Sequence, residues 1–321
     1  MSTRRVSLRG WGGVAAMAVA CVLTALFVLL PVAHSSGDEA PLGGPGVADG
    51  LQTAADDCTP EASSLRASAE TGPAVAAIRK RGRLVIGVDQ NSYRWGYRDP
   101  NKDGGSLEGF DIDLAKAIAR EILPGGPVQF RAIPTNQRIP ALKSGQVDMI
   151  VRTMTINCER LEQVDFSTAY FTTGQQVLAP RDSTITGYNR TLANKRVCSA
   201  KGSTAETALK AKSYGADVST TVPNQLDCLV RLQLGEVDAV VTDSALAAGQ
   251  AAQDPTVQLK GKPFTTEYYG IAMKKGSDDL VRRVNQVLVE YRAQEWQESY
   301  DKWLADDLGP DVEPPAPQYR D

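Results

Sequence analysis

Two stretches of the chain repeat each other, and this repeat constrains the possible fold more than any other feature. Residues 141–153 read ALKSGQVDMIVRT and residues 231–243 read RLQLGEVDAVVTD, with Leu, Gly, Val, Asp and Val matching at a constant offset. Each stretch predicts the end of a helix, a glycine that stops it and a short buried strand. The alternative is a chance recurrence of a common helix–glycine–strand pattern.

The segments that precede each repeat also match in type. RGRLVIGVDQ at 81–90 and NKRVCSAKG at 194–202 predict the first strand of each unit. Amphipathic patterns predict helices at 109–123 and 202–213. Strands that alternate with helices favour parallel α/β sheets. We therefore expect two α/β lobes of similar build.

The composition is that of an ordinary globular protein, with 42% hydrophobic and 23% charged residues. A net charge of −3 gives no reason to expect a nucleic-acid partner. The single histidine, His34, lies in a predicted linker. This excludes histidine-based catalytic triads and most catalytic zinc sites, and we expect neither a metal nor a cofactor.

The N-terminus predicts a membrane anchor. Arg4, Arg5 and Arg9 precede an uncharged apolar run over residues 12–33, which is long enough to cross a hydrocarbon core. The positive flank predicts that the rest of the chain lies outside the cytoplasm. We expect residues 1–33 to stay as an anchor; a cleaved secretion signal and a lipoprotein attached through Cys21 are the alternatives.

Low-complexity segments lie on both sides of the predicted folded region. Residues 34–75 are rich in Gly, Pro, Ala, Ser and Asp, which predicts a flexible linker. Residues 307–321 form a proline-rich tail that is not expected to be regular structure.

Four cysteines follow the predicted anchor, namely Cys58, Cys158, Cys198 and Cys228. An even number in an exported chain predicts two disulfides, for which three pairings are possible. Cys198 and Cys228 belong to one unit, so we pair them, and Cys58 then pairs with Cys158. Four free buried thiols are the alternative. A nucleophilic cysteine is not expected, because no histidine is available to activate it.

Polar residues at the ends of the two repeated strands indicate the kind of ligand. Thr155 and Arg160 follow the first repeated strand, and Asp243 ends the second. In open α/β sheets the functional crevice lies beyond the carboxyl ends of the strands. A helix that begins near Ser203–Thr204 adds backbone N–H groups suited to an anion. A ligand that carries both a carboxylate and an ammonium group, such as an α-amino acid, would satisfy all of these groups.

Several motifs together resemble a known family. They are GFDIDLAKAIA (109–119), IPALKSGQVDMI (139–150), MTINCER (154–160), VDFSTAY (164–170), GEVDAVVTD (235–243), YYGIAMKKGS (268–277) and YDKWL (300–304). The chain is similar here to the bacterial extracellular solute-binding proteins of family 3, the amino-acid-binding components of ABC importers. The arrangement looks closest to actinobacterial glutamine/glutamate-binding proteins.

The resemblance covers about residues 76–306 and implies a fold. This is an α/β, two-lobed, periplasmic-binding-protein-like (type II) fold with a two-segment hinge and a central ligand cleft. We expect lobe one to comprise residues 76–174 and 271–306, and lobe two residues 180–265. The chain is expected to cross between lobes near 174–179 and to return near 266–270.

The resemblance also implies a role for each matching residue at the amino-acid end of the ligand. Arg160 matches the arginine that binds the α-carboxylate bidentately. Thr155 matches the hydroxyl and backbone donor beside it, and Thr204 a backbone N–H that meets the carboxylate from lobe two. Thr153 matches a carbonyl that helps to hold the α-ammonium group, and Asp243 matches the carboxylate that pairs with it.

Three further residues bear on the side chain of the ligand. Trp95 sits at the aromatic wall of the family's pocket, and Asp89 matches a position that contacts the distal side chain in some members. Arg152, where many members carry a small residue, is expected to neutralise a glutamate or aspartate side chain. Asp89 instead favours an amide. We expect an acidic L-amino acid, with glutamine or asparagine next.

Structural roles are the alternatives to these assignments. Arg160 could brace its own loop through Glu162 or Asp165. Asp243 could cap the helix that follows it. Trp95 could be an ordinary core residue.

The expected function is capture of an amino acid by hinge closure and its delivery to the membrane subunits of an ABC importer. We expect a monomer, tethered outside the cytoplasm, without enzyme activity. One alternative is an amino-acid-sensing receptor subunit of a signalling pathway. A lesser one is a dehydratase-like enzyme on the same scaffold, against which Asp243 argues.

Overall fold

The computed structural model describes residues 58–99 and 105–320. The predicted anchor, Cys21, His34 and the linker up to residue 57 lie outside the described residues. Residues Ala54–Asp321 belong to one compact unit. Within the described ranges, no helix combines the length and the apolar character needed to cross a membrane.

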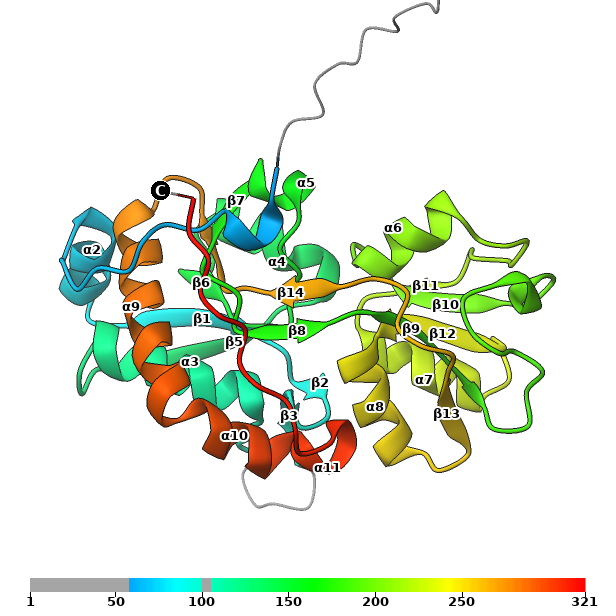
Figure 1. Ribbon diagram of the computed structural model, residues 1–321. Coiled ribbons are helices and arrows are strands. Elements are labelled where there is room, and N and C mark those ends of the chain that lie inside the picture. Colours follow the sequence, from blue (N-terminus) through cyan, green and yellow to red (C-terminus); the bar gives the residue numbers. More distant parts are fainter. Residues whose placement is uncertain (1–57, 100–104, 321) are drawn as a thin grey trace, which may run out of the picture. The chain divides into compact units, whose positions relative to one another are not determined.

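Lobe one is built on a five-stranded sheet with the order β5-β1-β6-β15-β7 (Figure 1). The strands are β1 (Leu84–Val88), β5 (Val128–Ala132), β6 (Met149–Ile150), β7 (Val164–Phe166) and β15 (Ala272–Lys274). The helices are α2 (Pro73–Arg81), α3 (Phe110–Ile122), α4 (Arg138–Lys143), α5 (Cys158–Leu161), α9 (Asp278–Gln294), α10 (Trp296–Trp303) and α11 (Ala305–Leu308).

Alternation along β1 gives lobe one a core on each face of its sheet. Ile86 packs in the cluster that contains the apolar faces of α3, α9 and α10. Its neighbour Val85 packs in a second cluster with Leu142 of α4. Successive strand side chains point to opposite faces, so a strand buried on both faces is apolar throughout.

Lobe two has a second five-stranded sheet, with the order β11-β10-β12-β9-β13. The strands are β9 (Gln175–Pro180), β10 (Val197–Ala200), β11 (Thr221–Val222), β12 (Ala239–Asp243) and β13 (Val257–Lys260). The helices are α6 (Thr204–Ala211), α7 (Gln225–Gln233) and α8 (Ser244–Gln253). Leu229 of α7 packs in the core on one face, and Leu209 of α6 packs in the core on the other.

The repeated stretches fold alike, as predicted. Helix α4 precedes β6, and α7 precedes β12. The repeated aspartates make the same contact in each lobe: Asp148 accepts the backbone N–H of Val85 at 2.8 Å, and Asp238 accepts that of Arg196 at 2.7 Å. Each carboxylate thereby fixes the start of its strand beside the preceding strand of the sheet.

The prediction of parallel sheets is only partly right. Strand β1 pairs in parallel with β5 and β6, and β10 with β11 and β12. However, β15 is antiparallel to β6 and β7, and β9 is antiparallel to β12 and β13. The reversed strands are the ones that enter each sheet directly from the other lobe, without a crossover helix to turn the chain.

Two adjacent strands connect the lobes. Strands β8 (Phe171–Thr173) and β14 (Glu267–Tyr269) pair antiparallel and lie between the two large sheets (Figure 1). Strand β8 leads into β9, and β14 leads back into β15. These strands form the two-segment hinge.

A small sheet lies beside α3 in lobe one. Its strands are β2 (Asn91–Ser92), β3 (Gly96–Arg98) and β4 (Leu107–Glu108), in that order. It follows β1 directly, so the end of β1 and the residues after it are fixed close to the space between the lobes.

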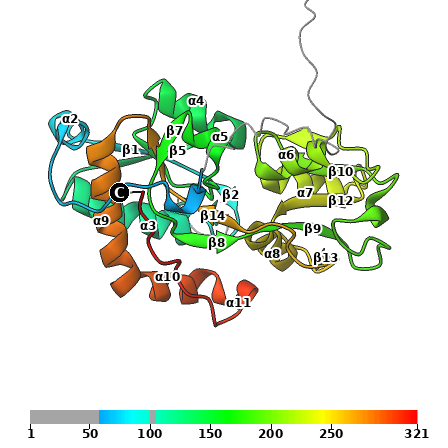
Figure 2. The ribbon, with the colours of Figure 1, turned by 45° about the horizontal axis from the view of Figure 1, so that its top comes forward.

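Residues 58–72, which the composition assigns to the linker, pack against lobe one (Figure 2). Leu65 is buried in the core, and the Ser64 hydroxyl donates to the carbonyl of Phe166 at 2.8 Å. The Asn285 amide donates to Ser64 and to the carbonyl of Leu65 at 2.8 and 2.6 Å. The C-terminal tail runs parallel to this segment where Tyr319 bridges Ser64.

The structure contains both predicted disulfides. Cys198 in β10 is bonded to Cys228 in α7, within lobe two. Cys58 is bonded to Cys158, the first residue of α5. The second bond attaches the N-terminal segment to the short helix that carries Arg160.

Candidate functional site

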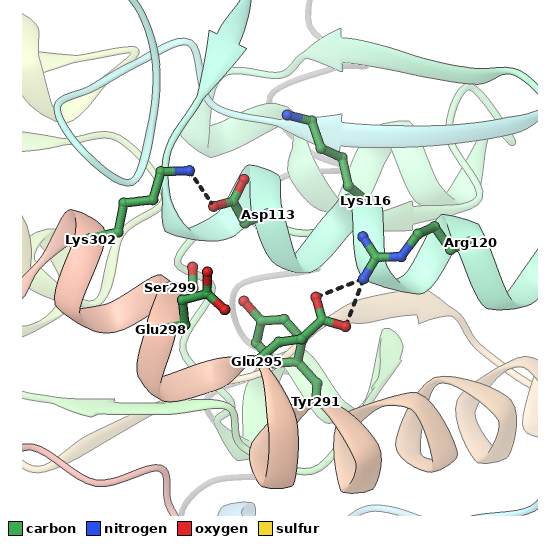
Figure 3. Close-up of a pocket in the computed structure, with 8 residues that line it drawn as sticks. All are labelled: Asp113, Lys116, Arg120, Tyr291, Glu295, Glu298, Ser299 and Lys302. Atoms are coloured by element: carbon green, nitrogen blue, oxygen red, sulfur yellow. Dashed lines mark hydrogen bonds and ion pairs between the residues drawn. The ribbon is translucent and has the colours of Figure 1, made fainter.

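Two cavities differ in their relation to the predicted residues. One, of about 150 Å³, lies on lobe one between α3, α9 and α10, where Arg120 pairs with Glu295 at 2.7 Å and Lys302 with Asp113 at 3.3 Å (Figure 3). It contains none of the predicted residues. The other, of about 390 Å³, is lined by residues of both lobes, and Arg160 is the one predicted ligand-binding residue among them.

Arg160 contacts both lobes. One of its nitrogens donates to the carbonyl of Thr155 at 2.7 Å, and the other donates to the carbonyl of Gly202 in lobe two at 3.1 Å. The Asn157 side chain caps α5 by accepting the backbone N–H of Arg160 at 2.9 Å. No ion pair joins Arg160 to Glu162 or Asp165 among the described residues, so the loop-bracing alternative receives no support.

Asp243 lies opposite, at the end of β12. It occupies the N-cap position of α8, but its side chain makes no capping hydrogen bond. It instead accepts from the amide of Gln175, the first residue of β9. Burial, followed by the nearby charge of Glu267, raises the pKa of Asp243 to about 7. Arg160 and Arg138 act in the opposite direction.

Glu267 is the most important polar residue that sequence reasoning missed. It lies on hinge strand β14 and is 7% exposed. Its carboxylate accepts the hydroxyl of Thr155 at 2.7 Å and the hydroxyl of Thr204 at 2.9 Å. The available signal was a carboxylate immediately before YYGIAMKKGS, at the predicted return between the lobes.

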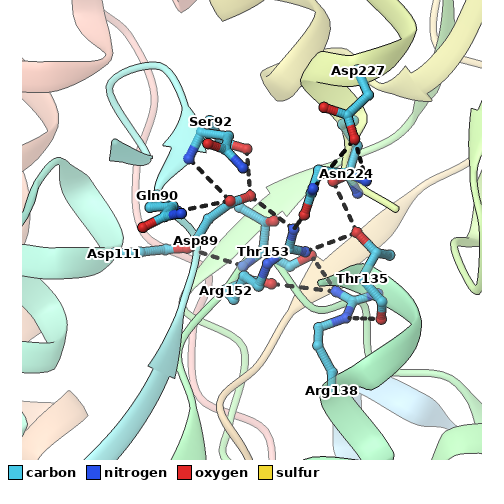
Figure 4. Close-up of polar contacts among 12 residues, drawn as sticks. Asp89, Gln90, Ser92, Asp111, Thr135, Arg138, Arg152, Thr153, Asn224 and Asp227 are labelled. Atoms are coloured by element: carbon cyan, nitrogen blue, oxygen red, sulfur yellow. Dashed lines mark hydrogen bonds and ion pairs between the residues drawn. The ribbon is translucent and has the colours of Figure 1, made fainter. Parts of the chain in front are cut away.

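A second group of charges lies at the ends of β1 and β6 (Figure 4). Arg152 pairs with Asp89 at 2.9 Å. It also donates to the hydroxyl of Thr135 at 3.0 Å and to the Asn224 side chain of lobe two at 3.4 Å. Arg152 and Asp89, from which the sequence predicted opposite ligand preferences, therefore form an ion pair with each other.

Arg138 belongs to the same group. It is 3% exposed and donates to the carbonyls of Thr135, Arg152 and Thr153 at 3.0, 3.3 and 3.3 Å (Figure 4). Burial, and then the charges of Arg160 and Arg152, lower the pKa of Arg138 well below its usual value. A ligand carboxylate placed here would meet two buried guanidinium groups.

Thr153 adopts an unusual backbone conformation. Its φ is 37°, which is rare for a β-branched residue. Its backbone N–H donates to the carboxylate of Asp111 at 3.0 Å, and Tyr170 donates to the same side chain at 2.8 Å. Strained backbone held by such contacts is typical of functional sites.

Trp95 and Ser203 make contacts outside this polar cluster. Trp95 is 1% exposed and packs edge-on against Phe110, Phe171 and Tyr269, with ring centroids 5.5, 4.9 and 5.6 Å away. This is the core placement that was the alternative to an aromatic pocket wall. Ser203 caps α6 by accepting the backbone N–H of Glu206 at 3.1 Å.

The remaining predicted residues come together from separate elements. Thr155, Arg160, Thr204 and Asp243 form one cluster with Gln175 and Glu267, while Asp89, Arg152 and Thr153 form the adjoining one. In the described part of the chain, no group of His, Cys, Asp or Glu is arranged to hold a metal ion.

Two lobes joined by paired crossing strands, with polar clusters between them, define the class of type II periplasmic binding proteins. The family assignment follows from the sequence. The model of the bacterial extracellular solute-binding proteins, family 3, matches residues 84–306, and the chain belongs to this family.

Curated relatives bear the names of amino-acid-binding proteins. The chain is 37% identical over 253 residues to the ABC transporter glutamine-binding protein GlnH of Bacillus subtilis, covering 78% of this chain and 92% of that protein. It is 29% identical over 254 residues to the glutamate-binding protein GluB of Corynebacterium efficiens, covering 75% and 84%.

Solved structures agree in fold. A mutant of the arginine-binding protein of T. maritima superposes with a TM-score of 0.68 at 31% identity, covering 73% of this chain and all of that one. A solute receptor for L-cysteine from Neisseria gonorrhoeae gives a TM-score of 0.69 at 28% identity, with coverage of 74% and 96%.

Proposed function

We propose that this protein binds a polar L-amino acid between its lobes, outside the cytoplasm, and delivers it to the membrane subunits of an ABC importer. The observation that carries the proposal is the meeting of opposite charges from separate lobes. Arg160 comes from α5 of lobe one, Asp243 ends β12 of lobe two, and each perturbs the pKa of the other.

The binding mode follows from these charges. The ligand carboxylate binds Arg160 and the N-terminus of α6 at Thr204, and the ammonium group binds Asp243. Both ends engage only when the lobes approach, so the ligand favours the closed form. Exclusion of water strengthens both charge pairs. A micromolar dissociation constant corresponds to about 8 kcal/mol, which two charge-assisted ends and a side-chain contact can supply.

We propose an acidic amino acid as the preferred ligand, with glutamine or asparagine next. At the side-chain end, the two buried guanidiniums of Arg138 and Arg152 face one paired carboxylate, Asp89. An additional carboxylate from glutamate or aspartate balances the excess positive charge. Relatives named for glutamine and for glutamate are both among the matches, which supports this pair of ligand types.

Isothermal titration calorimetry on the purified full chain tests the ligand proposal. The four ligands are L-glutamate, L-aspartate, L-glutamine and L-asparagine. We expect each acid to bind at least about tenfold more tightly than its amide, equivalent to about 1.4 kcal/mol. Tighter binding of both amides would contradict the acidic preference, and no binding of any of the four would contradict the polar-amino-acid proposal.

Uptake of labelled ligand tests the transport role. Deletion of the gene is expected to reduce uptake at low ligand concentration, and re-expression of the full chain is expected to restore it. Unchanged uptake, together with tight binding by the purified protein, would contradict the importer role and favour the sensing alternative.

A further inference from the structure

We infer that Glu267 is a positioning residue for the ligand's ammonium group, because it takes the hydrogen bond of the Thr155 hydroxyl and so leaves the Thr155 oxygen as an acceptor. This inference rests on the amino-acid binding proposed above. It adds Glu267 to the proposed site.

The position of Glu267 allows it to contact both lobes. Strand β14 pairs with β8, with Glu267 opposite Thr173 at the hinge. From there, one carboxylate oxygen accepts the hydroxyl of Thr155 in lobe one at 2.7 Å and the hydroxyl of Thr204 in lobe two at 2.9 Å. The other oxygen accepts from Thr265 at 3.3 Å.

The directions of these hydrogen bonds follow from chemistry. An ionised carboxylate only accepts, and a hydroxyl has a single proton to donate. Thr155 and Thr204 therefore both direct their protons at Glu267. The Thr204 oxygen also accepts from the amide of Gln175 at 3.0 Å. Among the described residues, the Thr155 hydroxyl makes no other hydrogen bond, so its oxygen retains free lone pairs.

Because the proton of the Thr155 hydroxyl points at Glu267, its oxygen can accept a hydrogen bond from a donor on the ligand. The ligand ammonium has three N–H donors, whereas the ligand carboxylate has none. With Asp243, the site then offers the ammonium group one carboxylate and one oriented hydroxyl. The nearby positive groups, Arg138 and Arg160, serve the acidic ends of the ligand. Recognition of the carboxylate by Thr155 is thereby left to its backbone N–H.

The substitution Glu267→Met tests this inference. A methionine side chain has a similar length but offers no strong acceptor, so the Thr155 hydroxyl proton is free to turn towards the ligand. The measurement is the ratio of the dissociation constants of glutarate and L-glutamate, which differ by the ammonium group. We expect the ratio to fall at least about tenfold, mainly through weaker glutamate binding, because hydrogen bonds to charged groups are strong.

Two further variants provide the controls. Glu159→Gln removes an exposed carboxylate that also acts on Arg160 but contacts neither hydroxyl, and its ratio should match the wild type. Thr155→Val removes the oriented hydroxyl. Adding Glu267→Met to it should not lower the ratio further. All variants are compared after thermal unfolding has established that they are folded.

The outcomes separate the inference from the proposed function. If Glu267→Met weakens both ligands equally, or leaves the ratio unchanged, Glu267 does not position the ammonium site and the inference is wrong. If the wild-type protein binds no amino acid, the proposed function fails and the inference fails with it.

Discussion

At the scale of single residues, the pair of Arg152 and Asp89 has a structural role besides the ligand-binding role proposed for it. Arg152 is 0% exposed and Asp89 is 4% exposed, with 2.9 Å between their charged atoms. A buried pair adds little net stability, but loss of one partner leaves an uncompensated buried charge. Substitution of Arg152 alone therefore changes folding as well as ligand selectivity.

Arg152→Met is expected to lower the free energy of unfolding by about 3 kcal/mol, because the buried Asp89 loses the charge that balances its own and keeps only the hydrogen bonds from Gln90, Asn91 and Ser92. Adding Asp89→Asn should recover much of this loss. Urea unfolding of the single and double variants measures both effects. A double variant as unstable as Arg152→Met would show that the charge pair is not the cause.

The raised pKa of Asp243 predicts that ligand binding is linked to proton release. Its pKa is about 7 in the ligand-free protein, so the carboxyl is largely protonated below that pH. An ammonium group beside it favours the carboxylate and lowers the pKa. Binding then releases a proton below about pH 7, and affinity decreases as the pH falls from about 7 to about 5.

Calorimetry at about pH 6, in two buffers with different ionisation enthalpies, measures the released protons directly. Burial also raises the pKa of Asp111 to about 7, so Asp243→Asn serves as the control that identifies the source. The variant should bind without a buffer-dependent heat. Equal heats in both buffers for the wild-type protein would contradict the linkage.

Sequence reasoning found the charged residues at strand ends but not their hinge partners. Arg160 and Asp243 follow repeated strands, where the topology places functional groups. Glu267 lies on the crossing strand β14, and its contacts with Thr155 and Thr204 exist only because the lobes meet. Gln175 is the cross-strand neighbour of Asp243 within the sheet of lobe two. No local pattern specifies that meeting. Trp95 was ambiguous for a related reason, because an aromatic residue suits both a pocket and a core.

At the scale of elements, α5 depends on its surroundings. It spans four residues, Cys158–Leu161, and a helix this short is not stable alone. The Asn157 cap and the bond from Cys158 to Cys58 hold it in place. Because α5 carries Arg160, its order determines where the guanidinium lies.

Replacing Cys58 and Cys158 by serine is expected to lower the free energy of unfolding by about 2–4 kcal/mol. It should also weaken glutamate binding, because α5 loses an attachment. The matched control replaces Cys198 and Cys228, which lie in lobe two. That control should lose stability but keep its affinity. Equal affinity losses in the two double variants would contradict a specific role for the Cys58–Cys158 bond.

The N-terminal segment shows why composition alone misled the linker assignment. Residues 58–72 contain no periodic apolar pattern, yet Leu65 is buried and Ser64 bonds to Phe166. Asn285, far along the chain, supplies the amide that holds the segment. Single long-range contacts of this kind leave no local signal.

At the scale of the whole molecule, the repeat predicted two lobes of similar build, and the structure confirms the two-lobed fold. The antiparallel direction of β9 and β15, the strands that follow the hinge, was not predicted. Alternation of helices and strands does not indicate which strands enter a sheet from the other lobe. The paired strands β8 and β14 then set how the lobes approach each other.

Gly174 lies between β8 and β9, beside Thr265 of the returning connection. A Cβ atom at this position would lie 2.0 Å from the carbonyl oxygen of Thr265. Gly174→Ala is expected to force the strands apart, to lower stability by about 1–3 kcal/mol and to weaken ligand binding through poorer closure.

The control for the hinge is Gly87→Ala, whose Cβ would clash with the Ile150 side chain inside lobe one. It should lose stability while keeping the ligand-induced compaction measured by small-angle X-ray scattering. Gly174→Ala should lose part of that compaction. Normal compaction and affinity in Gly174→Ala would contradict this role of the hinge.

The central claim is that opposite charges on the two lobes together hold both ends of an amino acid. The most direct measurement is calorimetric titration of L-glutamate into the folded variants Arg160→Met and Asp243→Asn, alongside the wild type. We predict that each substitution weakens binding by at least about 100-fold, since each leaves a charged ligand group without its partner. Full affinity in both variants would contradict the claim.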